Sequence, residues 1–313
     1  MKRITFVAIF AIAFGFSLQA QDRWKLEPDG SISWLEKKGE AHTDNIEMSG
    51  RFISTIITYG VDEKSNLIIG RRLVFPMLRT IPNDTHASLI YSFGQEASPV
   101  IRINNRQANE IVKSFSIRGM LTIRSTINNN ILVTRQLLPS IDKPLMIEKC
   151  VVHNKSGKDI TVDVEEFEKN TRTHKEKSVY GIYEISANII GSGIYVVKPE
   201  NSIAFSMVFS GRRVTEQKPV PDIDNEIVQR TAFVNEMFGN LQFISPDSVL
   251  NRMFDFAKIR AMESIFETKG GLVHSPGGAS YYAAIWANDQ AEYANPFFAY
   301  TGYSTAIEAG MVS

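Results

Sequence analysis

The sequence predicts a mainly β protein in which a large antiparallel β-sandwich is followed by helices. Between residues 22 and about 215, apolar side chains recur at every second position and turn residues separate the runs, a pattern typical of strands. After residue 220 the apolar spacing lengthens to about three and a half residues, which is typical of helices. The chain has 313 residues, of which 43% are hydrophobic, so it is long enough for about two domains.

The composition excludes several classes of protein. The 34 basic residues balance 34 acidic ones, which argues against a strongly basic nucleic-acid-binding protein and against an acidic tail. Cys150 is the single cysteine, so the chain has neither a disulfide framework nor a cysteine-rich zinc site. We expect no cofactor, and no metal motif is visible, although calcium bound by scattered acidic residues stays open as an alternative. The oligomeric state is not predicted.

The first 20 residues have the pattern of a secretory signal peptide. Lys2 and Arg3 precede an apolar run from Ile4 to Phe16, and small or polar residues lead to Ala20. The apolar run is shorter than the roughly 20 residues that a membrane-spanning helix needs. We therefore expect a periplasmic or secreted protein that does not contact the membrane after the signal is removed. The alternative is an uncut membrane anchor.

Residues 21–218 are predicted to form the sandwich, with roughly ten to fourteen strands. In residues 121–127 apolar residues alternate with polar ones, and Asn128–Asn130 is expected to turn the chain into a second strand. Pro76 is expected to end a strand because proline cannot donate to a strand ladder. Residues 51–59 and 67–75 are predicted to form a hairpin around Asp62–Asn66. The other predicted strands are residues 145–153, 160–164 and 202–210.

Residues 219–244 are predicted to be a linker with a helix. Ile227, Phe233 and Met237 lie on one face of that helix, and Gly239 is expected to end it. The last predicted domain, residues 245–313, opens with a strong helix start. There Ser245 is the expected cap, Pro246 suits the first helical position, and Asp247 favours the positive end of the helix dipole. This helix is predicted to present Leu250, Met253, Phe254, Ala257, Ala261 and Ile265 on one face and to end at Gly270–Gly271.

Candidate functional residues gather between Gly270 and Gly302. A sugar ring has an apolar face that stacks on aromatic rings and a fringe of hydroxyls that pair with carboxylates and amides. Trp286, followed three residues later by Asp289, offers both kinds of group from one turn of backbone. We therefore predict a sugar site. Its candidate catalytic residues are Asp289 and Glu292, and its candidate substrate-binding residues are His274, Tyr282, Trp286, Asn288 and Gln290.

Structural roles for the same residues are the alternative. Asn288 and Asp289 could cap a helix running from Gln290 to Tyr300, with Glu292 completing a capping box. His274 could be an ordinary loop histidine. Ordinary core residues in this stretch would be Tyr281, Ile285, Phe297 and Phe298.

The chain resembles the six-hairpin glycosidases, including the glucoamylase and α-L-rhamnosidase groups. The resemblance lies in the order of a large β-sandwich, a linker helix, "SPDSVLNRMFDFAK" and "WANDQAEY", and in the upstream "HTDNIEMSGR" and "FPMLRTIPNDT". It implies an N-terminal β-supersandwich followed by an (α/α)6 toroid, with residues 245–313 as the start of the catalytic domain. It also implies that the substrate is an oligo- or polysaccharide.

The resemblance also suggests roles for particular residues. In glucoamylase-like members a Trp-x-x-Asp motif binds the terminal sugar, which here corresponds to Trp286 and Asp289. In other members an acid at a similar place donates a proton to the leaving group, so two roles stay open for Asp289. Asn288 stands where the family has arginine, which leaves the sugar specificity open. The expected reaction is inverting hydrolysis of O-glycosidic bonds by two carboxyl groups about 6.5–9.5 Å apart.

The length predicts an incomplete toroid. Twelve helices with their loops need at least roughly 200 residues, whereas 313 − 240 = 73 residues follow position 240. We expect a truncated glycosidase with little or no hydrolytic activity. Two other hypotheses stay open, a non-catalytic carbohydrate-binding β-sandwich and a structural or interaction protein of the cell envelope.

Overall fold

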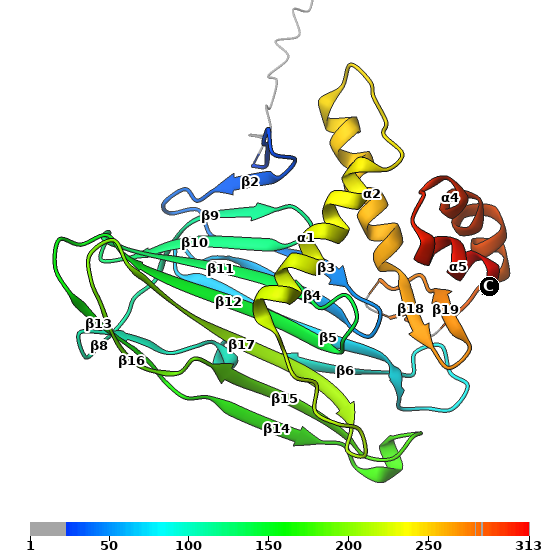
Figure 1. Ribbon diagram of the computed structural model, residues 1–313, viewed down its shortest axis with the longest axis horizontal. Coiled ribbons are helices and arrows are strands. Elements are labelled where there is room, and N and C mark those ends of the chain that lie inside the picture. Colours follow the sequence, from blue (N-terminus) through cyan, green and yellow to red (C-terminus); the bar gives the residue numbers. More distant parts are fainter. Residues whose placement is uncertain (1–22, 279, 283, 313) are drawn as a thin grey trace, which may run out of the picture.

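A nine-stranded antiparallel sheet is the largest element of the structure, a computed structural model that describes residues 23–278, 280–282 and 284–312. Buried apolar residues alternate with less buried ones along its central strands. A second layer of sheets lies against it (Figure 1). In spatial order its strands are β1 (Lys25–Leu26), β2 (Ile32–Leu35), β9 (Ile111–Ile117), β10 (Leu121–Ile127), β11 (Ile131–Pro139), β12 (Leu145–Asn154), β17 (Ser202–Arg213), β15 (Tyr183–Ile190) and β14 (Glu168–Arg172).

Two four-stranded sheets form the second layer of the sandwich. The first contains β3 (His42–Ser49), β4 (Ser54–Val61), β5 (Leu67–Arg79) and β6 (Ser88–Phe93). The second contains β16 (Gly193–Val197), β13 (Ile160–Val164), β7 (Ile101–Ile103) and β8 (Arg106–Gln107). Each sheet shares a hydrophobic core with part of the nine-stranded sheet, the first around Phe115 and Phe209 and the second around Val133 and Phe205. Short 3-10 helices lie at η1 (Gln95–Ala97) and η2 (Lys175–Lys177).

The predicted hairpins are confirmed. Strand β10 pairs with β11 from Leu121↔Leu137 to Ile127↔Ile131. Asn128 and Asn129 make the turn with φ of 51° and 62°, values that asparagine tolerates better than most residues. Strands β4 and β5 form the other predicted hairpin, around Asp62–Asn66.

The prediction that Pro76 ends a strand is wrong. Strand β5 continues through Pro76 to Arg79. Its pairing with β6 shifts register between Phe75 and Arg79, so this stretch is a bulge. A bulge leaves a backbone position unpaired, and proline is tolerated there because it has no N–H to donate.

Helix α1 (Ile223–Gly239) crosses the outer face of the nine-stranded sheet (Figure 1). Asp222 caps it by accepting from the Asn225 backbone N–H, and Lys149 of β12 forms an ion pair with Asp224. The helix ends at Gly239, as predicted, and Phe233, Val234 and Met237 are buried on its inner side.

Helix α2 (Ser248–Glu263) differs from its prediction at both ends. Asp247, not Ser245, is the capping residue, and its carboxylate accepts from the backbone N–H groups of Val249 and Leu250. The helix ends at Glu263, before Gly270. Residues 265–274 form a hairpin of β18 (Ile265–Thr268) and β19 (Gly271–His274), so Gly270 lies in the hairpin turn and Gly271 begins the second strand. Ile265 and Phe266 are buried in strand β18 and do not belong to the helix.

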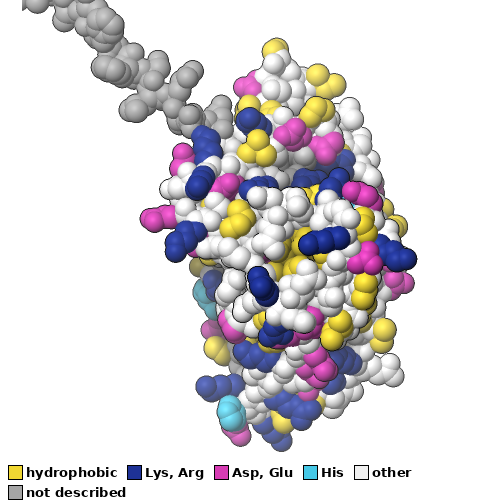
Figure 2. Space-filling view, turned by 90° about the vertical axis from the view of Figure 1, so that its left-hand side faces the viewer, with side chains coloured by type: hydrophobic (Ala, Val, Ile, Leu, Met, Phe, Trp, Pro, Cys, Tyr) yellow, Lys and Arg dark blue, Asp and Glu magenta, His cyan; other side chains and the backbone are white. Residues whose placement is uncertain are grey.

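The apolar face predicted for α2 is largely exposed at the far end of the helix. Leu250 and Met253 are exposed, whereas the helix buries Lys258, Ile259, Met262 and Glu263. Apolar side chains therefore gather at the end of the α1–α2 pair, at the top of Figure 2. Elsewhere on the face shown, basic and acidic side chains are interspersed. Within the described ranges, no helix combines the length and the apolar character needed to cross a membrane.

The C-terminal segment packs on α1, α2 and the β18–β19 hairpin. It consists of α3 (Ala287–Asp289), a π-helix η3 (Gln290–Ala294), α4 (Asn295–Tyr300) and α5 (Ser304–Val312). One core joins Met237, Ile259, Leu272, Phe298 and Ala306. The fold class is thus confirmed as a large antiparallel β-sandwich followed by a linking helix and a few C-terminal helices. The toroid stays a prediction, and the predicted signal peptide lies outside the described residues.

Candidate functional site

The predicted sugar-binding segment begins where β19 ends and continues into the C-terminal helices. Backbone hydrogen bonds define the loop that leads to Trp286. Gly277 and Tyr281 exchange a reciprocal pair with N–O distances of 3.1 and 2.8 Å, and Ser275 Oγ donates to the Ala284 carbonyl at 2.6 Å. Gly277 and Gly278 have φ of 71° and 63°, a conformation that glycine adopts without the strain a side chain would bring. These hydrogen bonds hold Ser275, Gly277 and Tyr281 in place within the described part of the loop.

Tyr282 anchors this loop to the sandwich. Its side chain is only 2% exposed, and its ring meets Phe266 edge to face. Its hydroxyl donates to Glu47 Oε1 of β3 at 2.8 Å. A buried phenol needs such a partner because losing water without a replacement hydrogen bond is costly.

Charged side chains extend this anchor into the helices. Arg260 of α2 lies 3.3 Å from Glu47 Oε2 and donates to the Glu47 backbone carbonyl at 3.0 Å. Glu263 receives hydrogen bonds from both Arg260 and Arg230, the latter on α1. Burial alone would lower the pKa of Arg260, but Glu263 and Glu47 hold it above its ordinary value. The sandwich, both long helices and the loop before Trp286 are therefore joined through one set of ion pairs.

Three aromatic rings form a partly exposed surface beside the loop. Tyr281 is 38% exposed, and its ring centroid lies 5.1 Å from that of Trp286. The ring of His86, in the loop between β5 and β6, also contacts Tyr281, with 4.7 Å between the ring centroids. His86 was not among the predicted site residues. It is 195 positions before Tyr281, so no local pattern could link the two residues.

Asp289 does not cap a helix, and the capping alternative is wrong. It occupies the last position of α3 with helical angles, φ of −62° and ψ of −39°, and makes no side-chain capping hydrogen bond. The capping box with Glu292 fails for the same reason. Asp289 is half-buried, whereas Asn288 and Glu292 are exposed. The carboxylate of Asp289 is therefore not committed to a helix end.

His274 and Gln290 are held together on the inner side of the same segment. Gln290 is 3% exposed, and its Nε2 lies 3.0 Å from His274 Nδ1 and 3.2 Å from the His274 carbonyl oxygen. Burial lowers the pKa of His274 below its ordinary value, although the nearby charge of Asp289 opposes that shift. Gln290 Oε1 is buried and has no hydrogen-bond partner among the described residues. His274 is thus a packed side chain with Phe298 against its ring.

A cavity of about 360 Å³ lies between this loop and the sandwich. Tyr282 and Ile285 line it from the loop, Arg79 from β5, and Lys269 from the turn between β18 and β19. Lys269 Nζ lies 3.7 Å from the ring centre of Tyr180, another lining residue. The described lining does not include Trp286 or Asp289, so the aromatic surface lies beside this cavity and not inside it.

No metal site is found in the part of the chain that the structure describes, since it holds no group of three or more His, Cys, Asp or Glu side chains able to bind an ion. The predicted residues that the structure brings together are His274 with Gln290, and Trp286 with the loop held by Tyr282.

Comparisons with known proteins add little to this geometry. The chain matches no protein-family model, and no curated protein matches it. One solved structure to which it is similar is described as "Putative kojibiose phosphorylase from human microbiome", with 10% sequence identity and a TM-score of 0.46. The match covers 93% of this chain and 46% of that one, so this chain spans less than half the length of that structure.

Proposed function

We propose that this chain is part of a carbohydrate-active enzyme and that Trp286 and Asp289 form one wall of its site for a sugar ring. The observation that carries the proposal is the half-buried carboxylate of Asp289, which is free of any capping role and lies one helical turn from Trp286. The partly exposed rings of Tyr281 and His86 extend the apolar surface next to Trp286. The resemblance of "WANDQAEY" to the six-hairpin glycosidases supports the same assignment.

The chemistry that we propose is cleavage of an O-glycosidic bond with inversion. Such a reaction needs one carboxyl group to protonate the leaving oxygen and a second to activate the attacking water. Asp289 would either bind the hydroxyls of the terminal sugar or act as the acid. Glu292, exposed on the next turn, is the second candidate carboxylate. The protein would act in the periplasm or outside the cell, because residues 1–20 have the pattern of a signal peptide.

Sugar binding to the purified protein tests the proposal. Titration of maltose, kojibiose and α-L-rhamnosides is followed by tryptophan fluorescence and by calorimetry. Loss of a hydrogen bond to a charged group costs about 1.5–3 kcal/mol, so Asp289→Asn should weaken binding at least about tenfold. Trp286→Ala should weaken it similarly. Matched controls are Asp159→Asn and Tyr300→Ala, which change exposed residues elsewhere.

The result that would overturn the proposal is equal binding by Asp289→Asn and Asp159→Asn, or no binding of any of these sugars. Glycoside cleavage is measured on the same samples with and without inorganic phosphate, because water and phosphate can attack the same carbon. Cleavage that Asp289→Asn leaves unchanged would exclude Asp289 as the acid.

A further inference from the structure

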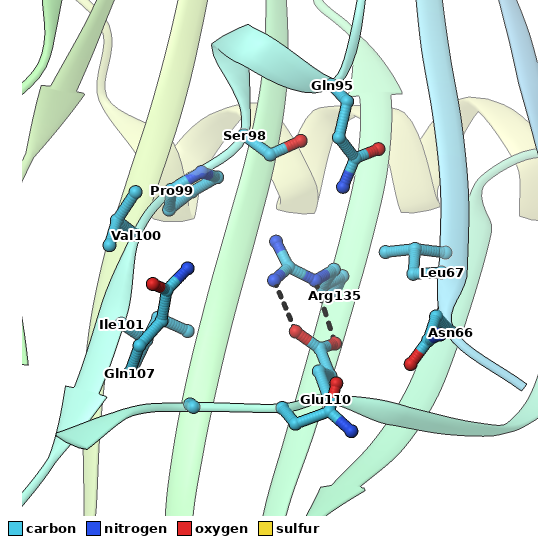
Figure 3. Close-up of a pocket in the computed structure, with 12 residues that line it drawn as sticks. Asn66, Leu67, Gln95, Ser98, Pro99, Val100, Ile101, Gln107, Glu110 and Arg135 are labelled. Carbon is cyan, nitrogen blue, oxygen red and sulfur yellow. Dashed lines mark hydrogen bonds and ion pairs between the residues drawn. The ribbon is translucent and has the colours of Figure 1, made fainter. Parts of the chain in front are cut away.

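A second cavity, of about 330 Å³, lies in the sandwich and shares no lining residue with the cavity beside the Trp286 loop. It is lined by the first residue of β5, by residues in and after η1, by the β7–β8 hairpin and by Arg135 of β11. Figure 3 shows Arg135 of β11 at its centre, with Gln95 and Gln107 on opposite sides of the guanidinium. Its volume is at the lower end of the range for small-molecule sites.

The floor of this cavity is an ion pair with no net charge. Arg135 donates from Nε and Nη2 to the two oxygens of Glu110, at 3.1 and 2.6 Å. From Nη1 it donates to Glu148 Oε1 at 2.7 Å, and Glu148 is also paired with Arg71 below the floor. Burial alone would raise the pKa of Glu110, but the charge and hydrogen bonds of Arg135 hold it below its ordinary value. Arg135 and Glu110 are therefore both ionised, and their opposite charges offset each other.

The rim is built from neutral hydrogen-bonding groups. The amides of Asn66, Gln95 and Gln107 line it, and each amide can both donate and accept. Ser98 Oγ accepts from Arg71 at 3.4 Å, which leaves its own proton to donate. Figure 3 places the side chains of Leu67, Pro99 and Ile101 around the same space, so the cavity also has apolar wall.

We propose that this cavity is a second binding site that takes a neutral, polyhydroxylated ligand of the size of one sugar ring. Hydroxyl groups both donate and accept, which matches the amides of the rim, and the apolar C–H face of a ring matches the wall. The charged lining residues are Glu110 and Arg135, which are bonded to each other. Because these two opposite charges offset each other, the lining offers no net attraction to either an anion or a cation. Among the described residues no aromatic ring lines the cavity, so binding should be weak, on the order of 1 mM.

Nuclear magnetic resonance on the whole, nitrogen-labelled protein tests this site. The probes are the methyl glycosides of glucose, galactose and rhamnose, with inorganic phosphate as the anionic comparison. At least one glycoside should shift the signals of Gln95 and Gln107, and phosphate should not. Gln107→Ala should weaken that binding about fivefold, the effect of one lost neutral hydrogen bond. Gln217→Ala, an exposed glutamine outside the cavity, is the matched control.

Four outcomes would decide against the site. The proposal is wrong if none of the three glycosides shifts these signals at its solubility limit, if phosphate shifts them instead, or if Gln107→Ala binds as well as Gln217→Ala. Shifts confined to the residues around Trp286 would support the proposed function and overturn this inference. Shifts at Gln107 that survive Asp289→Asn would show that the two sites are independent.

Discussion

Replacing Tyr282 by phenylalanine should loosen the loop that carries Trp286. The substitution keeps the ring that packs against Phe266 and removes only the hydroxyl that donates to Glu47 Oε1 at 2.8 Å. Because the side chain is 2% exposed, water cannot simply take the place of the lost partner. The change therefore isolates one tie between the loop and strand β3.

The expected cost follows from the partners that Glu47 retains. A hydrogen bond to a charged group contributes about 1.5–3 kcal/mol. After the substitution Glu47 still accepts a hydrogen bond from Ser54 Oγ at 2.8 Å and still forms an ion pair with Arg260 at 3.3 Å. The carboxylate is not left unsatisfied, so we expect the lower end, about 1.5 kcal/mol. That difference makes local opening of the loop about tenfold more frequent.

Amide hydrogen exchange measures this opening directly. The backbone N–H groups of Gly277 and Tyr281 bond reciprocally across the loop, so their exchange reports its opening. Tyr282→Phe should speed both about tenfold. Tyr293→Phe, at a ring that is 65% exposed, makes the same chemical change and should leave both rates as they are. In a Glu47→Gln background the effect of Tyr282→Phe should shrink, because the acceptor is then neutral.

The reasoning is refuted if the two amides exchange at equal rates in Tyr282→Phe and Tyr293→Phe. The loop would then owe its position to the packing of the ring and to its own backbone hydrogen bonds. An undiminished effect in the Glu47→Gln background would show that the hydroxyl acts through a different partner.

Two further predictions concern stability. Glu148→Gln removes the buried charge shared by Arg71 and Arg135 and should lower the free energy of unfolding in urea by about 3–5 kcal/mol. Glu165→Gln is the control, because the pair of Glu165 with Arg102 is solvent-exposed and contributes at most about 1 kcal/mol. A loss in Glu148→Gln no larger than that in Glu165→Gln would contradict the prediction. Burial lowers the pKa of His274, so the unfolded chain binds more protons, and stability should be fully present above about pH 6.5 and fall as the pH drops below it. In His274→Asn the free energy of unfolding should depend less steeply on pH across this range. His174→Asn, which changes an exposed histidine, is the control and should keep the slope of the unchanged protein.

Most of the sandwich was predictable because local patterns specify it. The alternation in residues 121–127 and the asparagine turn after it predict β10, β11 and their register. The apolar face of residues 227–237 and Gly239 predict helix α1. The errors arose where a local rule has two outcomes. Proline can end a strand or lie in a bulge, and paired glycines can end a helix or turn a hairpin. Pairing with distant residues decided both cases.

The candidate site was predictable only as a set of residue types. An indole and a carboxylate three positions apart identify Trp286 and Asp289, but the same spacing fits a helix cap. The cap was excluded by backbone angles and by the absence of a side-chain bond from Asp289 to the start of the helical segment. His86 and Glu47, which contact the loop from the sandwich, carried no signal because nothing near them in the chain points to residues 281–282.

The amino-acid pattern alone determined the class of each element, since the period of apolar residues and the identity of turn and cap residues act over a few positions. It also determined which part of the chain is rich in sugar-binding residue types. Contacts over long sequence separations were decided only in three dimensions. They place His86 beside Tyr281, join Tyr282 to Glu47, and close a neutral cavity over the Arg135–Glu110 pair. The physical reason is that each contact depends on burial and charge pairing between strands and loops that the order of residues does not bring together.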